Sequence, residues 1–328
     1  MTIWRRCSYE PPAVTLPLFA PEELPLKKKL TSRLSALAAE GILMGTSSWK
    51  YEGWLGQLYT PERYLTRGRI SRKKFDESCL AEYGEIFPVV CGDFSFYQFP
   101  APAFWKKLFS SAPPQLRFAF KVPEEVTARQ WPSHARYGAR GGLRNSTYLD
   151  AELFRTSFTD PLLPYAGRVT SLIFEFGAVA RPNLDEFLAG LEPFLKRLPS
   201  EFRYAVEIRN PEFLCPEYLA LLARHQVAHV LNSWTRMPEL GVQQSVPGVF
   251  TSDFFVVRAL LRPGRPYEEA VKRFSPYAQV QEPNQSARRT LRELIGYARS
   301  SGRRALIFVN NRLEGNAPGT IDAVLDGE

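Results

Sequence analysis

The stretch "ALIFVNNRLEGNAPG" at residues 305–319 contains a predicted strand that is apolar on both faces, and polar residues follow it directly. Ala305 to Val309 is an unbroken apolar run, and such a run is typical of a central strand in a parallel sheet. Asn310 and Asn311 follow at once, and amides are costly to bury without hydrogen-bond partners. The stretch therefore predicts a central parallel strand whose carboxyl end opens onto polar surroundings.

Seven similar apolar runs precede this strand, and helical patterns lie between most of them. The runs are ILMGT (42–46), VVCGDF (89–94), LRFAFK (116–121), SLIFEF (171–176), RYAVEI (203–208), VAHVL (227–231) and FFVVR (254–258). The clearest helical patterns cover residues 184–198 and 291–298, whereas the helix after the sixth run is weak. Eight strands alternating with helices predict an α/β fold, a single (β/α)8 TIM barrel. A doubly wound open sheet is the alternative, because periodicity does not show closure.

The first 40 residues are predicted to form an N-terminal extension to the barrel domain, which we assign to residues 41–328. Residues 1–25 are rich in proline and lack periodicity, so we expect an extended arm there. Leucines at positions 26, 30, 34 and 37 then recur at helical spacing. Gly41 is a suitable residue to end that helix.

The composition is that of a soluble globular protein, with 45% hydrophobic and 23% charged residues among 328. A formal charge of +8 favours anionic partners, but it is moderate and below that expected of a nucleic-acid-binding tail. The four cysteines show no CxxC or CxH spacing, which disfavours a disulfide framework and a zinc knuckle. We find no segment of secretory or membrane-spanning length, so we expect a cytoplasmic protein with no membrane partner.

In both architectures ligands bind at the carboxyl ends of the strands, and polar or aromatic residues recur there. These predicted site residues are Trp49, Asp93, Tyr97, Lys121, Glu175, Glu207, Arg209, Arg258, Asn310 and Asn311. Side chains alternate along a strand, so Glu207 and Arg209 can share one pocket. Asn310 and Asn311 cannot both face it, and we expect one of them to cap a turn or the following helix. Asn232 and Trp234 follow the sixth apolar run.

The chemical roles of the charged residues remain open at this level. Lys121 and Glu207 are either a salt-bridged pair that closes the barrel or an acid, base or anion anchor in a functional pair. Glu175 and Glu207 lie on neighbouring strands like a general acid/base pair, although simple proximity is the favoured interpretation. Trp49 belongs to an aromatic loop, for which packing is favoured over stacking against a ligand.

The predicted site offers cations and amides, which suit an oxygen-rich anion such as phosphate. Three histidines and no carboxylate motif disfavour a metal, and no nucleotide fingerprint assigns a cofactor. The long connections 122–148 and 259–283 add further basic residues at the same face. Three function classes follow: an enzyme on an anionic small molecule, a nucleic-acid-binding or processing protein, and a non-catalytic barrel. We expect Asn310→Ala to remove a ligand contact with little loss of stability. The oligomeric state is left open.

Five stretches in order resemble the motifs of the YecE-like family, also called domain of unknown function 72. They are GTSSWKYEGW (45–54), DFSFYQFP (93–100), LRFAFKVPEEVT (116–127), AVEIRNPEF (205–213) and FVNNRLEGNAPG (308–319). The resemblance covers residues 41 to 325 and implies a TIM barrel without an accepted activity. Pocket similarity of that barrel to endonuclease-type barrels implies phosphate or nucleic-acid ligands only by analogy.

The chain also departs from the family pattern. Cys91 stands at the family's usual glutamate, Asn210 at its histidine, Phe213 at its tryptophan and Glu175 at its glutamine. The sequence RALL at residues 258–261 replaces RLHG. Positions that match are Lys121, Glu207, Arg209, Asn310 and Asn311. These departures imply a divergent member in which chemistry that depends on the replaced glutamate or histidine is lost.

Overall fold

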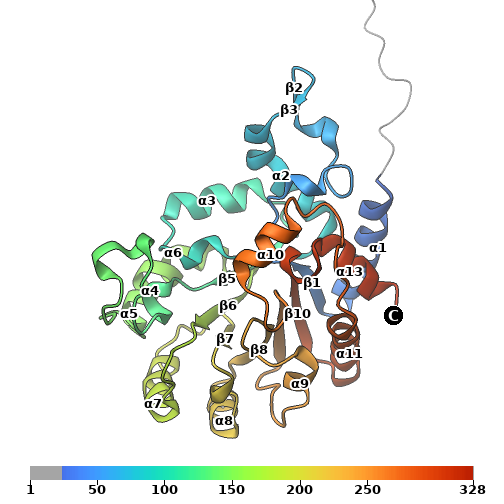
Figure 1. Cartoon of the computed structure of the whole chain (residues 1–328). Coiled ribbons are helices and arrows are strands. Elements are labelled where there is room, and N and C mark those ends of the chain that lie inside the picture. Colours follow the sequence, from blue (N-terminus) through green and yellow to red (C-terminus); the bar gives the residue numbers. More distant parts are fainter. Residues whose placement is uncertain (1–23, 328) are drawn as a thin grey trace, which may run out of the picture.

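Eight parallel strands close into a barrel in the computed structural model, which describes residues 24–327 (Figure 1). Around the barrel the order is β1-β10-β9-β8-β7-β6-β5-β4. The strands are β1 (Ile42–Thr46), β4 (Val89–Gly92), β5 (Arg117–Lys121), β6 (Val169–Phe176), β7 (Tyr204–Ile208), β8 (Ala228–Ser233), β9 (Phe254–Ala259) and β10 (Arg304–Val309). All eight predicted strands are present. Because the sheet closes on itself, the fold is the predicted TIM barrel and not the open sheet. β8 runs further than predicted, so Asn232 lies within the strand.

Helices surround the barrel, and smaller elements lie in the connections. The helices are α1 (Pro25–Ala39), α2 (Arg72–Ile86), α3 (Pro102–Ser111), α4 (Glu124–Thr127), α5 (Ala151–Phe154), α6 (Asp160–Leu162), α7 (Leu184–Leu195), α8 (Pro216–Arg224), α9 (Leu240–Gln244), α10 (Tyr267–Phe274), α11 (Gln285–Ser301), α12 (Asn311–Glu314) and α13 (Ala317–Leu325). A small hairpin, β2 (Leu65–Thr66) with β3 (Arg69–Ile70), follows β1. The weak helix predicted after the sixth strand is the five-residue α9.

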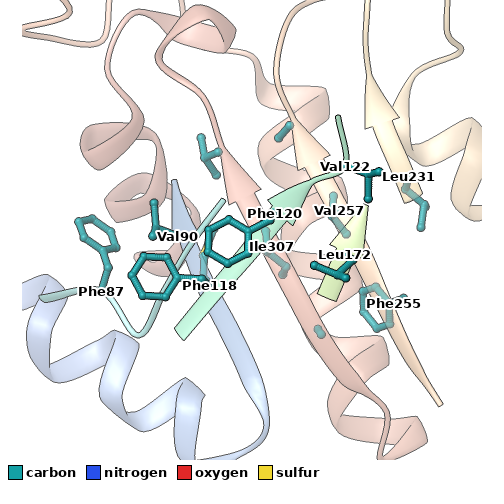
Figure 2. Packing of buried hydrophobic residues seen from close by; sticks show 14 of the residues in the cluster. Phe87, Val90, Phe118, Phe120, Val122, Leu172, Leu231, Phe255, Val257 and Ile307 are labelled. Carbon is teal, nitrogen blue, oxygen red and sulfur yellow. The ribbon is translucent and has the colours of Figure 1, made fainter. Parts of the chain in front are cut away.

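Alternate residues of each strand divide between two apolar layers, as the period of a strand requires. Side chains such as Ala119, Ile173 and Val256 form a cluster inside the barrel. The intervening residues, among them Phe118 and Leu172, pack in the larger cluster between strands and helices (Figure 2). The barrel interior is therefore a filled core, and only its last layer at the carboxyl ends is available for polar groups.

The barrel closes at a narrow seam between β1 and β4, where only Thr46 and Val90 are paired among the residues of these two strands. The Tyr83 hydroxyl of α2 lies in the seam. It accepts a hydrogen bond from the Thr46 backbone N–H at 3.1 Å and donates one to the Val89 carbonyl at 3.0 Å. Gly45 is required here because a Cβ would lie 1.9 Å from the Val89 oxygen. A side chain thus replaces the missing ladder hydrogen bonds.

Helix α1 begins at Pro25 and packs Leu30, Leu34 and Leu37 into the core, where the leucine spacing predicted a helix. It ends at Ala39, and Gly41 follows with a φ of +82°. The predicted extended arm lies almost wholly in residues 1–23, outside the described part of the chain. Within residues 24–327, no helix has both the length and the hydropathy that crossing a bilayer requires.

Candidate functional site

A polar layer caps the apolar interior of the barrel at the carboxyl ends of the strands. Its side chains lie two residues beyond interior apolar residues, which fixes their inward direction. By this spacing the layer contains Lys121, Glu175, Glu207, Asn232, Arg258 and Asn310. Asp93 and Arg209 join it from the residues that directly follow β4 and β7. The predicted charged residues therefore converge on one site.

Arg258 is the centre of an ionic network that fills this layer. Its Nη1 lies 2.5 Å from Glu207 Oε2 and 3.0 Å from Glu175 Oε2, and its Nη2 lies 2.8 Å from Asp93 Oδ1. Arg209 Nη2 lies 2.7 Å from Glu175 and 2.5 Å from Glu207. Lys121 Nζ completes the network at 3.0 Å from Glu175. Three cations thus balance three carboxylates.

Burial makes this balance necessary. Glu207 and Arg258 are 0% and 1% exposed, and an unpaired charge at that depth is strongly destabilising. Burial alone would raise the pKa of Glu175, but Arg209, Lys121 and Arg258 hold that pKa well below its usual value. A carboxyl group that stays ionised cannot serve as a general acid near neutral pH. Glu175 therefore acts as a fixed negative charge that positions cations.

Neighbouring uncharged groups hold the cations in place. Arg209 Nη1 donates a hydrogen bond to Asn232 Oδ1 at 3.2 Å, and its guanidinium lies 4.1 Å from the centre of the Trp234 ring. The Lys121 ammonium lies 3.6 Å from the centre of the Phe96 ring. Cation–π contacts of this kind add to the ion pairs that hold both side chains at the mouth.

Above the network lies an open cavity of about 550 Å³ at the barrel mouth. Lys121, Glu175, Arg209 and Arg258 form its floor, and Lys50, Arg136 and Arg312 lie on its rim with aromatic residues such as Tyr97 and Tyr267. Of the rim cations, Arg136 pairs with Glu124 at 2.9 Å. Within the described chain, Lys50 and Arg312 have no carboxylate partner. The mouth therefore carries positive charge in excess of the balanced floor.

The two asparagines that follow β10 lie in different environments. Asn310 lines the mouth cavity, and its Oδ1 accepts a hydrogen bond from the Arg312 backbone N–H at 3.0 Å, which caps α12. Asn311 does not reach the cavity, because its Oδ1 accepts a hydrogen bond from the Ala317 backbone N–H at 2.7 Å beneath α12. Its prediction as a substrate-binding residue gains no support. Because Asn310 caps α12, Asn310→Ala should also lower the stability of the fold. The sequence alone predicted little loss of stability from this substitution.

The remaining predicted residues surround the cavity in different environments. Trp49 lines it but is only 7% exposed and packs edge-on against Phe94. Tyr97 is 56% exposed at the rim, where the Arg136 guanidinium lies 4.6 Å from its ring centre. Cys91 lies beneath the network, and burial raises the pKa of its thiol to about 12. This thiol is therefore protonated and no nucleophile.

Metal ligation has no set of residues to support it in the part of the chain that the structure describes. No group of three His, Cys, Asp or Glu side chains there could hold an ion. His229 is buried, its Nδ1 lies 3.1 Å from the Tyr218 hydroxyl, and burial lowers its pKa to about 3. It is a neutral core residue, which is the interpretation favoured by its position within a strand.

Sequence reasoning missed most of the rim. Lys50 and Arg312 stand beside predicted residues in SSWKYEGW and NNRLEGN, and their adjacency was the available signal. Arg136 lies in the long connection 122–148, and nothing in that stretch distinguishes it from the other basic residues there. Trp234 was placed at a strand end, but its contact with Arg209 had no signal in the sequence.

The fold and this mouth define a TIM-type barrel with an ionic layer at its carboxyl face, and known proteins share the fold. Residues 43–326 match the family described as "Protein of unknown function DUF72". UPF0759 protein YecE of Escherichia coli strain K12 is 30% identical over 134 residues. That match spans 41% of this chain and 42% of YecE, less than half of either.

Solved structures agree with the fold. Crystal structures of DUF72 family proteins from Enterococcus faecalis V583 and Thermotoga maritima MSB8 align with TM-scores of 0.58 and 0.56, each at 18% identity. Both alignments cover 87% of this chain, and they cover 95% and 96% of those proteins. At this identity the likeness concerns the fold alone. The chain belongs to the DUF72 family, as its motifs predicted.

Proposed function

We propose that this barrel binds a phosphate-containing small molecule at its mouth, on the cations of the rim and floor. One observation carries the proposal: six cations and only two carboxylates line the cavity. The third carboxylate, Glu207, lies beneath them and is already paired. The carboxylates that would repel an anion are thus neutralised within the network, and the excess positive charge faces the ligand.

Acid–base chemistry on such a ligand would fall to Lys121. Glu207 is fully buried between Arg209 and Arg258 and has no path to a substrate. Glu175 is held ionised by its cations. Lys121 alone among the three proposed catalytic residues combines a place in the cavity wall with a group that carries a proton.

The test measures binding of inorganic phosphate by calorimetry and by ³¹P line broadening. The double variant Lys50→Gln/Arg312→Gln removes two rim charges outside the buried network, so the fold should persist. We expect its affinity for phosphate to fall by about tenfold or more, because each charged hydrogen bond contributes roughly 1.5–3 kcal/mol. Crystals soaked in phosphate or sulfate should show the anion at the mouth.

Arg224→Gln is the matched control, since Arg224 is exposed at the end of α8, next to the amino end of β8. It should bind phosphate as the unchanged protein does. Absence of phosphate binding at tens of millimolar, or equal losses in the rim and control variants, would contradict the proposal. So would a transition metal bound at the mouth with no anion near Lys121 or Arg209.

A second candidate function, nucleic-acid binding, is favoured by the β2–β3 hairpin. Residues 63–74, RYLTRGRISRKK, contain six basic residues and no acidic one, and all six are exposed. The hairpin belongs to the connection after β1, on the side of the barrel mouth, and projects from the body (Figure 1). A concentrated basic projection suits a phosphate backbone, which it would bind with steep salt dependence.

Fluorescence anisotropy with labelled single- and double-stranded oligonucleotides tests this function. The triple variant Arg67→Gln/Arg69→Gln/Lys73→Gln should lower both the affinity and the slope of log K against log salt. The control replaces Lys196, Arg197 and Arg224, which lie near the amino ends of the strands, by glutamine. If both triple variants lose affinity equally, the hairpin is not a nucleic-acid interface.

A further inference from the structure

A second cavity, of about 690 Å³, lies beside the mouth and is not used by the proposed function. It lies between residues 127–149 and the junction of β6 with α7. Phe96 and Glu175 line both cavities. Lys121 contacts both of these residues, at 3.6 Å from the ring centre of Phe96 and 3.0 Å from Glu175. The two cavities are therefore neighbours that share Phe96 and Glu175 in their walls, and Lys121 contacts both shared residues.

Aromatic rings form one wall of this side cavity. The Phe187 and Phe213 rings stack with centres 4.8 Å apart and planes at 6°, and Phe176 meets Phe187 edge-on at 5.0 Å. Tyr148 and Trp131 also line the space. Preformed aromatic surfaces of this kind bind flat apolar groups by area burial and ring contacts.

Small residues open the cavity on its β6 side. The run FGAVA at residues 176–180 ends β6, and its glycine and alanines contribute little bulk. A Cβ added to Gly177 would meet no atom within 4 Å, and its φ is not positive. The space at this position is thus set by side-chain size, and a larger residue can be accommodated without backbone strain.

Most charged groups around the side cavity have a partner of opposite charge or a hydrogen-bond donor. Glu124 accepts hydrogen bonds from Arg136 and Tyr137, and Arg129 pairs with Glu186 at 2.5 Å. Arg144 also lines the cavity, is exposed, and has no carboxylate partner within the described chain. The aromatic wall is consequently suited to an uncharged flat group, whereas the mouth, with its larger number of cations, is suited to the anion.

We propose that the two cavities bind one ligand, with its phosphate at the mouth and an aromatic group in the side cavity. The substrate class is then a phosphate monoester of an aromatic alcohol, in preference to a sugar phosphate or free phosphate. This inference rests on the proposed function, because the mouth supplies the anion site. Lys121, in contact with both shared residues, would then face the ester oxygen that joins the two parts of such a ligand.

The test compares three ligands by calorimetry: inorganic phosphate, glycerol 3-phosphate and 1-naphthyl phosphate. We expect 1-naphthyl phosphate to bind at least about tenfold more tightly than the other two, since burial of a few methylene-sized groups gives that factor. Gly177→Leu should remove this advantage and leave the affinity for inorganic phosphate unchanged. Ala178→Phe, at a second exposed position of the same wall, should do the same.

Gly167→Leu is the matched control. A Cβ at Gly167 also meets no atom within 4 Å, and this residue lines neither cavity. It should retain the preference for 1-naphthyl phosphate. Equal affinity for all three ligands, with phosphate still bound, would overturn the two-part ligand while leaving the proposed function intact. If no phosphate compound binds, both proposals fail. Loss of the preference in Gly167→Leu as well would also overturn the side-cavity assignment.

Discussion

Arg258→Met is the sharpest test of the ionic layer, because it removes one guanidinium from three carboxylates. Asp93 is partly exposed and can be hydrated, and Glu175 keeps Lys121 and Arg209. The loss therefore falls mainly on Glu207, which is fully buried and keeps only Arg209. Breaking a buried ion pair from one side costs about 3–5 kcal/mol, and the retained partner places the expected loss near the lower end, at about 3 kcal/mol.

The loss should depend on pH in a direction that the pKa of Glu175 fixes. The ordinary pKa of this side chain is 4.5, and its folded-state pKa lies well below that value. Its stabilising contribution is therefore fully present above about pH 4.5 and disappears as the pH falls toward the folded-state pKa. Arg258 is one of the cations that lower this pKa, so the variant has less of this contribution to lose. The difference between the two proteins should therefore be the same at pH 7.5 and pH 5, and should narrow only below about pH 4.5, as the pH approaches the folded-state pKa.

Equilibrium urea unfolding at both pH values, followed by tryptophan fluorescence, measures this difference. Arg72→Met is the control: Arg72 is 84% exposed on α2, and its carboxylate contacts are no closer than 3.6 Å. It should leave the free energy of unfolding unchanged at both pH values. A loss under about 1 kcal/mol for Arg258→Met, or a loss that already shrinks between pH 7.5 and pH 5, would refute the argument from buried charge.

Three further predictions concern single groups. Tyr83→Phe should lower the free energy of unfolding by about 1–3 kcal/mol in urea titrations, because the Thr46 N–H and the Val89 carbonyl lose their partner. An unchanged urea midpoint would show that the β1–β4 seam does not need the hydroxyl. Asn310→Ala should cost about 1 kcal/mol in the same assay through loss of the α12 cap, and Asn310→Ser, which keeps a capping oxygen without adding a charge, should retain most of the stability. Cys91, with its pKa raised to about 12, should resist maleimide at pH 8 until urea unfolds the chain, as read by mass spectrometry.

The strands were predictable because their residues are apolar on both faces, and the parity of Glu207 and Arg209 agrees with their pairing at 2.5 Å in one layer. Eight strands predicted a closed barrel, but the mechanism of closure was not predictable. It depends on Gly45 accepting a close backbone approach and on Tyr83, a residue of α2, bonding across the seam. No period in the sequence encodes a contact between a helix side chain and two strands. The prediction therefore gave the elements and the barrel, and left open the contacts that close it.

The candidate site was also predictable only in part. Residues within strands, such as Lys121 and Arg258, were found because the strand period fixes their direction. Rim residues such as Lys50 and Arg312 lie in connections, whose course depends on tertiary packing. Both asparagines were predicted as substrate-binding residues, with one of them expected to cap a turn or the following helix. Asn310 caps α12 and lines the cavity, whereas the amide of Asn311 accepts a hydrogen bond from the Ala317 N–H.

Charge balance in the ionic layer has a consequence for how this sequence can change over time. Replacing one charged residue of the ionic layer leaves a buried charge without a partner, so a second replacement must restore the balance. Two departures from the family pattern fit that rule: a carboxylate is absent from β4, where Cys91 stands, and one is present on β6 as Glu175. The two differences cancel in charge, so the layer keeps a sum of zero with its carboxylate on β6 and none at position 91 of β4.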